Sequence, residues 1–162
     1  MFIEVKDKNQ IDILERLAKE IWTEHYSPII GKVQVDYMLD KYQSAKAIKN
    51  QISNEKFIYY LIYDKNYPSG YIGIQFKEDE LFLSKLYVLN LKRNKGFGRK
   101  AIQFIVGLAK EKHLNKISLT VNKYNTGTIK AYEKFGFDNL GSVVADIGNG
   151  FIMDDYKMVK SF

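Results

Sequence analysis

Hydrophobic residues in the first third of the chain recur every three or four positions, which is the spacing of an amphipathic helix. This spacing holds over residues 11–22 and again over 35–42 and 45–52, where Ser44 can serve as the N-cap of the last helix. Residues 2–6 alternate instead and predict a short strand. The first third is therefore one strand followed by helices. Breaks in the chain after the first helix are predicted at Ser27, Pro28 and Gly31.

The middle of the chain changes to patterns that are typical of β-strands. Residues 57–63 are rich in aromatic and β-branched side chains, which favours a strand. Residues 71–76 predict the second strand of a meander and 81–89 the third, with polar turns at 64–70 and 77–80. Apolar residues occupy both faces of the third strand, so we expect it to be buried on both sides.

The last part of the chain alternates between helix and strand. Helical spacing predicts helices at 101–113 and 125–135, and a strand lies between them at 117–121. Two further strands are predicted at 137–147 and 151–159. This order of elements indicates an α/β fold. The turn signals are Gly136 as a helix C-cap and Gly148, Asn149 and Gly150 as the turn of a hairpin.

The composition fits one folded domain over residues 1–162. Hydrophobic residues make up 46% and aromatic residues 14% of the chain, which excludes disorder. Cysteine is absent, which excludes disulfides, thiolate metal sites and a cysteine nucleophile, and two histidines offer no metal-binding cluster. The start of the chain lacks the order of a signal peptide, and no apolar run reaches about 18 residues. We expect a soluble cytoplasmic protein with no metal and no membrane contact.

The formal net charge of +6 and the pI near 9.2 leave two classes of anionic partner open. A basic protein can bind nucleic acid, or it can hold a polyanionic cofactor on a local patch. Lysines are spread along the chain, as on an ordinary solvated surface. The densest cluster, residues 92–100, coincides with two glycines. A phosphate-bearing small molecule explains that cluster better than a nucleic acid does, and we expect no nucleic-acid partner.

Residues 88–100 read as a strand end, a tight basic loop and the first turn of a helix. Such a loop can turn several backbone N–H groups toward one point, at the positive end of the helix dipole. Arg93 and Lys95 add positive charge, and arginine can hold phosphate oxygens in a bidentate fork. Gly96 and Gly98 permit the tight turn. The loop is therefore a candidate seat for a pyrophosphate.

Two spaced motifs follow one another along the second half of the chain. The pattern V-x-P-x-x-[QR]-x-x-G-x-[GA] is matched at Val88, Arg93, Gly96 and Gly98, and the pattern N-x-x-[AST]-x-x-x-Y-x-x-x-G-F is matched at Asn125, Thr128, Tyr132, Gly136 and Phe137. Together with the order of the elements, they resemble the GNAT superfamily of acyl-CoA-dependent N-acyltransferases over essentially the whole chain. Asn90 replaces the usual proline, and Asn94 replaces a usual glycine. Asparagine tolerates the positive φ that this loop requires, so we expect the loop to form.

The resemblance implies a mixed, mostly antiparallel sheet of about seven strands, with helices on both faces and a central parallel pair that splays apart. It implies transfer of an acetyl group from acetyl-CoA to a primary amine by direct attack, with Tyr132 as general acid for the leaving thiolate. From the residues alone, Tyr132 can instead be a packing residue and Asn125 a helix N-cap. Relatives are frequently dimers, which keeps a homodimer open. The implied cofactor contacts are Leu86, Tyr87, Val88, Arg93, Asn94, Lys95, Gly96, Phe97, Gly98, Arg99 and Asn125.

The acceptor side is less specified. Many relatives carry a glutamate on the strand before the loop, but residues 82–86 contain no carboxylate. The general base is left open between ordered water and a group such as His25. A non-catalytic CoA-binding or sensor domain is therefore an alternative function. The candidate acceptor contacts, in part through a loose similarity to polyamine N-acetyltransferases, are Trp22, His25, Tyr26 and Asp154, of which Trp22 can equally be a core aromatic.

Overall fold

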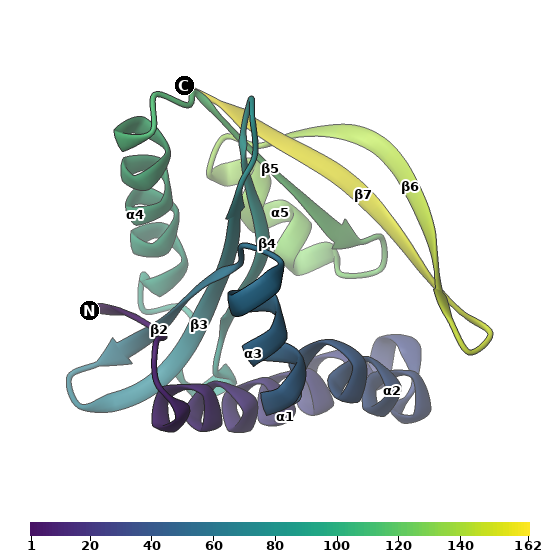
Figure 1. The fold of residues 1–162 in the computed structure, drawn as a ribbon. Coiled ribbons are helices and arrows are strands. Elements are labelled where there is room, and N and C mark those ends of the chain that lie inside the picture. Colours follow the sequence, from purple (N-terminus) through teal and green to yellow (C-terminus); the bar gives the residue numbers. More distant parts are fainter. The chain divides into compact units, whose positions relative to one another are not determined.

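The computed structural model describes all 162 residues and contains one seven-stranded mixed sheet with five α-helices, as predicted. The strand order in the sheet is β1-β2-β3-β4-β5-β7-β6. None of the helices has both the length and the apolar character needed to cross a bilayer. The elements, labelled in Figure 1, are β1 Phe2–Glu4, α1 Lys8–Ile30, α2 Lys32–Gln43, α3 Ala45–Asn54, β2 Ile58–Asp64, β3 Tyr67–Phe76, β4 Leu81–Val88, α4 Phe97–Glu111, β5 Lys116–Asn122, α5 Thr126–Lys134, β6 Asp138–Gly148 and β7 Phe151–Ser161.

The chain divides into two compact units, and the boundaries between them include one within β4 and one within α4. The first unit consists of Met1–Gln75 and Lys85–Ala101, and the second of Phe76–Ser84 and Ile102–Phe162. The first therefore holds β1 to β3, helices α1 to α3 and the basic loop. The second holds β5, α5 and the β6–β7 hairpin.

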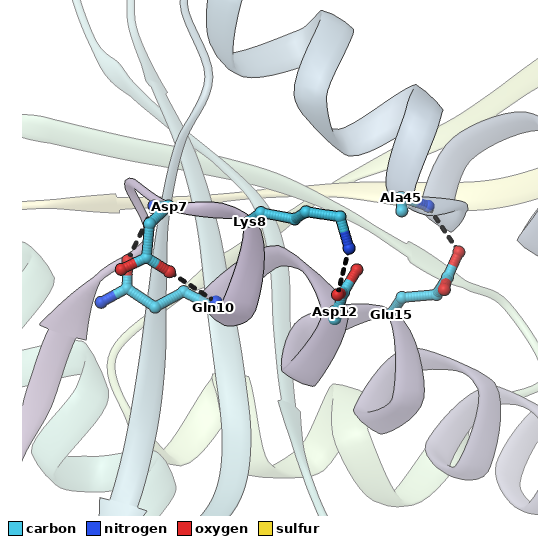
Figure 2. Close-up of polar contacts among 6 residues, drawn as sticks. All are labelled: Asp7, Lys8, Gln10, Asp12, Glu15 and Ala45. Carbon is cyan, nitrogen blue, oxygen red and sulfur yellow. Dashed lines mark hydrogen bonds and ion pairs between the residues drawn. The ribbon is translucent and has the colours of Figure 1, made fainter.

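Side-chain capping fixes where the helices of the first unit begin. Asp7 and Gln10 form a capping box at the start of α1: the Asp7 carboxylate accepts from the Gln10 N–H at 2.8 Å, and Gln10 Oε1 accepts from the Asp7 N–H at 3.0 Å (Figure 2). One turn along, Glu15 accepts from the backbone N–H of Ala45 at 2.5 Å, which ties α1 to the start of α3 (Figure 2). The Ser44 hydroxyl caps α3 at 3.1 Å, which confirms its predicted role.

Helix α1 is longer than the sequence indicated, and the break predicted at Ser27 and Pro28 is wrong. The helix runs through Pro28 and ends only at Gly31, where φ is 86°. Proline fixes φ near the helical value and removes one N–H donor, and one lost bond in a last turn does not stop a helix. The closing bond, from the Gly31 N–H to the Ser27 carbonyl at 3.0 Å, survives beside it.

The β2–β3 turn is shorter than predicted, because β3 already begins at Tyr67. Pro68 lies within the strand, opposite Tyr63, at a register shift where the ladder is interrupted and a missing N–H is tolerated. Gly70 also lies within the strand. A Cβ at this position would sit 2.2 Å from the Tyr87 carbonyl oxygen, so only glycine allows β3 this close to the end of β4.

A buried polar network joins α2 and α3 to the strands of the first unit. Gln43 donates to the Tyr59 hydroxyl at 3.1 Å and accepts from the Tyr71 hydroxyl at 2.7 Å. The Tyr59 hydroxyl in turn donates to Gln51 at 2.5 Å. Burial raises the pKa of both tyrosines, so each stays a neutral hydroxyl. The network satisfies polar groups that would otherwise be costly to bury and fixes the helices against the sheet.

The second unit is built on β5. The parallel ladder between β4 and β5 spans two residue pairs, Leu81–Ile117 and Phe82–Ser118, whereas β5 pairs antiparallel with β7 along its whole length. The β6–β7 hairpin turns at Asn149 and Gly150, with φ of 55° and 77°, as the sequence predicted, and its tip extends beyond the end of β5 (Figure 1). Burial of β4 is less than predicted: after Leu83 its residues are half-buried.

Candidate functional site

The basic loop of the first unit has the backbone geometry that the sequence predicted. Residues Asn90–Lys92 form one 3₁₀ turn after β4, and α4 begins at Phe97. Between them, φ is 60° at Asn94 and 85° at Gly96, which confirms that asparagine adopts the left-handed conformation here. The Lys100 N–H donates to the Gly96 carbonyl at 3.1 Å and starts the helix. The first amides of a helix have no carbonyl to bond within it, so this end can receive an anion.

Two basic side chains of this loop, Lys92 and Arg93, are held by neighbouring groups. Lys92 is held by Asp64 at 3.0 Å, and this hydrogen bond lowers the pKa of the aspartate. Arg93 folds back: its Nε donates to the Val88 carbonyl at 3.3 Å, and its Nη2 lies 3.5 Å from His25 Nδ1. On the β1–β2 side, a surface hollow of about 370 Å³ is lined by Met1, Phe2, Tyr63, Asp64, Lys65, Lys95, Phe97 and Lys100.

The aromatic acceptor candidates form one cluster in the first unit. The Tyr26 hydroxyl lies 2.9 Å from that of Tyr87, and the Trp22 and Tyr87 rings meet edge to face with centroids 5.6 Å apart. Trp22 is 3% and Tyr26 7% exposed, so the reading of Trp22 as a core aromatic fits its burial. His25, whose ring centroid lies 4.8 Å from that of Tyr26, is half-buried rather than fully exposed. The cluster therefore joins α1 to the last residues of β4.

Lys85 is a residue that the sequence reasoning missed. It lies on β4, two residues before Tyr87 and therefore on the same face of the strand. Its ammonium group sits 5.1 Å from the centroid of the Phe57 ring, and burial lowers its pKa to about 8. The available signal was a lysine inside an otherwise apolar strand. A lysine in this state can change its charge close to neutral pH.

Both residues of the second motif that were expected to meet the cofactor lie in the second unit. Asn125 occupies the N-cap position of α5 but makes no side-chain capping bond, and it is 6% exposed. The N-cap role proposed for its side chain is therefore not realised. Tyr132 is buried, and its ring packs edge to face on Phe137 with centroids 5.3 Å apart. A buried phenol on a helix can deliver a proton to a developing thiolate.

The adjacent aspartates of β7 have different surroundings. Asp154 pairs with Lys123 at 2.6 Å and is partly exposed. Asp155 is 9% exposed, and its Oδ1 has no hydrogen-bond partner. Burial raises the pKa of Asp155 to about 6, with a further contribution from the charge of Asp154. No group of three or more histidine, aspartate or glutamate side chains is arranged to hold a metal ion.

Comparison with known protein families decides the identity. The model of the acetyltransferase (GNAT) family matches residues 14–137, which is more than half of the chain. The chain belongs to the GNAT acetyltransferase family. It is accordingly an acyl-CoA-dependent N-acetyltransferase, as the two motifs predicted.

Solved structures of other family members share the fold of this acetyltransferase. The PaiA N-acetyltransferase from Thermoplasma acidophilum, in complex with coenzyme A, superposes with a TM-score of 0.80 at 18% identity over 100% of this chain and 99% of its own. A probable acetyltransferase from Staphylococcus epidermidis gives 0.77 at 18% over 99% of both chains. The ribosomal-protein-S18-alanine N-acetyltransferase from Escherichia coli gives 0.71 at 15% over 99% and 94%. At these identities the likeness concerns the fold.

Proposed function

We propose that this acetyltransferase transfers the acetyl group of acetyl-CoA to a primary amine of a small molecule or peptide, by direct attack of the amine in a ternary complex. The observation that carries the proposal is the loop before α4. Positive φ at Asn94 and Gly96 shapes a turn at the positive end of a 15-residue helix, with Arg93 and Lys95 on it. That combination fits a pyrophosphate with two negative charges.

The remaining cofactor contacts follow from the family motif. The backbone of Leu86, Tyr87 and Val88 would hold the pantetheine arm, and the amides from Arg93 through Asn94, Lys95, Gly96, Phe97 and Gly98 to Arg99 would hold the pyrophosphate. Arg93 now donates to the Val88 carbonyl, and we expect it to release that bond when phosphate oxygens arrive, because a charge-assisted bond to phosphate is the stronger one. Asn125, which does not cap its helix, has an amide that can bond the pantetheine arm. Tyr132 would protonate the thiolate.

The proposed acceptor is a primary amine of a small molecule or of a peptide. A neighbour of the same fold is named as an N-acetyltransferase of an alanine of ribosomal protein S18, so the fold alone does not choose between peptide and small molecule. His25, Tyr26 and Trp22 on α1, and Asp154 on β7, are the proposed acceptor contacts. The ion pair of Asp154 with Lys123 means that a cationic amine would have to compete with the lysine.

The proposal is tested by a free-thiol assay with acetyl-CoA against a panel of amines, including spermidine, lysine, an aminoglycoside and short peptides. We expect thiol release with one class of amine and little without an acceptor. CoA binding by calorimetry with no thiol release from any amine would instead favour the sensor domain. Molar mass from light scattering tests the homodimer, which stays a prediction.

A further inference from the structure

The surface hollow of about 370 Å³ lies within the first unit, beside the basic loop. Its lining, given above, comes from three segments of the chain: the start of β1, the end of β2 with the turn that follows it, and the stretch from the loop into α4. Lys95, Phe97 and Lys100 belong to the last of these segments. The hollow therefore adjoins the proposed pyrophosphate seat.

Backbone pairing holds the β1–β2 side of the hollow in place. The Tyr63 N–H donates to the Met1 carbonyl at 2.8 Å, and Asp64 lies opposite Tyr67 where β2 turns into β3. Lys65 opens this two-residue turn with φ of 56°. Glycine or asparagine is the usual choice for that conformation, so the turn itself gives no reason for a lysine. A function in the hollow, which Lys65 lines, gives one.

Positive charge at the hollow exceeds what its one carboxylate can neutralise. Asp64 is already bound by Lys92 at 3.0 Å. Lys65 and Lys95 are close enough for their charges to act on the same carboxylate. Lys65, Lys95 and Lys100 are all exposed, and none of them forms an ion pair. Like charges brought to one place repel one another, and an anion bound between them removes that cost.

Aromatic side chains form the apolar part of the lining. Phe2, Tyr63 and Phe97 come from β1, β2 and α4, and each of them is half-buried. Aromatic rings are the surfaces on which the flat bases of nucleotides stack in proteins. A ligand that carries a flat base next to a phosphate therefore finds both kinds of partner in one hollow.

We propose that the hollow receives the 3′-phosphoadenosine end of acetyl-CoA and that Lys65 helps to bind its 3′-phosphate. The inference rests on the function proposed above and adds a second anion site to it. In CoA the pyrophosphate joins the pantetheine arm to a 3′-phosphorylated adenosine, so a pyrophosphate on the loop has the adenosine next to it. A phosphate monoester carries a charge of about −1.5 to −2 at neutral pH, which suits three lysines without ion pairs. Lys65 lies outside both sequence motifs and gives the enzyme a preference for CoA over carriers that lack the 3′-phosphate.

The test compares the affinities of CoA and of dephospho-CoA, which lacks only the 3′-phosphate, by calorimetry at low salt without an acceptor. We expect the wild type to bind CoA about tenfold or more tightly than dephospho-CoA, because charge-assisted bonds to phosphate are strong. In Lys65→Asn we expect CoA affinity to fall by about three- to tenfold while dephospho-CoA affinity is nearly unchanged, so that the preference shrinks. Asparagine tolerates the left-handed conformation of residue 65, so the variant keeps the turn.

Lys56→Asn is the matched control for this substitution. Lys56 is also an exposed lysine in the left-handed conformation, with φ of 59°, and it precedes β2, at the opposite end of that strand from the hollow. This variant should keep the wild-type preference for CoA over dephospho-CoA. An equal preference in Lys65→Asn and Lys56→Asn would overturn the proposal.

Two further measurements separate this inference from the proposed function. Adenosine 3′,5′-bisphosphate should compete with CoA. If it binds to protein that is already saturated with CoA, the hollow is a separate nucleotide site and the proposal is overturned. Binding is read without turnover, so a wild type that acetylates no amine refutes the proposed transfer, while the preference for CoA still decides the inference. If the wild type binds neither CoA nor dephospho-CoA, the proposed function and this inference fail together.

Discussion

Tyr132 is the residue whose two readings differ most in their consequences. As a packing residue it contributes the ring that meets Phe137, whereas as general acid it contributes the hydroxyl. Tyr132→Phe keeps the ring, and we expect kcat to fall by about 100-fold at neutral pH with unchanged CoA affinity, since only the proton donor is lost. The measurement is steady-state kinetics beside calorimetry. Tyr124→Phe, at a tyrosine that is 69% exposed, is the matched control, and equal rates for both variants would exclude Tyr132 from the chemistry.

Asp155 also makes stability depend on pH. Its folded pKa of about 6 lies above the ordinary aspartate value of 3.8, so the folded state binds more protons between these values. The free energy of unfolding contributed by this group therefore falls as pH rises from 4 to 7. We expect Asp155→Asn to gain on the order of 1–2 kcal/mol relative to the wild type over that range, after allowance for solvent screening. Urea denaturation at both pH values measures it; a difference that does not change with pH would contradict the raised pKa.

Some properties of single residues could be predicted from the sequence, and others could not. The positive φ of Asn94 was predictable. Asparagine stands here at a position where glycine is usual, and asparagine tolerates the left-handed conformation that glycine adopts. Which of the adjacent residues Asp154 and Asp155 is buried was not predictable. Adjacent strand residues face opposite sides, but which side is buried depends on the register of β7 against β5. Lys85 was missed for a similar reason, because its burial depends on packing against Phe57, 28 positions earlier in the numbering.

At the scale of elements, Gly96 in the loop and Gly107 in α4 form a matched pair for substitution by alanine. Gly96 has φ of 85°, whereas Gly107 lies in the regular part of α4, and a Cβ at either would meet no atom within 4 Å. Alanine at 96 would cost about 1–2 kcal/mol in the left-handed conformation or force the loop to change. We therefore expect Gly96→Ala to weaken CoA binding by about tenfold or more.

The control, Gly107→Ala, should raise the free energy of unfolding by up to about 1 kcal/mol, because alanine is the better helix former, and should leave CoA affinity unchanged. Calorimetry and urea denaturation of the two variants check both statements. Equal CoA affinities for Gly96→Ala and Gly107→Ala would contradict the assignment of the loop as the pyrophosphate seat.

Elements whose ends are set by local signals, such as caps and turns, were predicted well. Elements whose ends depend on long-range contacts were not. Ser44, Gly136 and the Asn149-Gly150 turn act locally, and their elements begin or end as expected. Pro28 predicted a break because proline removes a backbone hydrogen bond at its own position. Burial of Tyr26 against β4 instead favours the longer helix. The early start of β3 at Tyr67 likewise depends on pairing with β2.

At the scale of the whole molecule, a net charge of +6 and a polyanionic co-substrate give binding a salt dependence. A ligand that binds only the folded state stabilises it by about 2.7 kcal/mol at 100 times its Kd. We expect CoA to raise the midpoint of thermal unfolding, and to do so less at 1 M salt, where the screening length is about 3 Å. Differential scanning fluorimetry at two salt concentrations checks this, and a shift equal at both would speak against charge-assisted binding in the loop.

The fold as a whole was predictable because two motifs and the order of the elements were consistent with one architecture. The seven strands, their mixed directions and the family membership are confirmed. The acceptor was not predictable. The proposed acceptor contacts are side chains whose surroundings are set by tertiary packing, and no local pattern encodes that packing.

Acetylation of an amine at the expense of acetyl-CoA is the central claim, and isotope-labelled acetyl-CoA tests it most directly. The protein is incubated with carbon-13-labelled acetyl-CoA and the amine panel, and the products are analysed by mass spectrometry. The account predicts one class of amine with the labelled acetyl group on nitrogen, together with an equal amount of free CoA. Labelled acetate and CoA with every amine unmodified would mean thioester hydrolysis in place of transfer, and would contradict it.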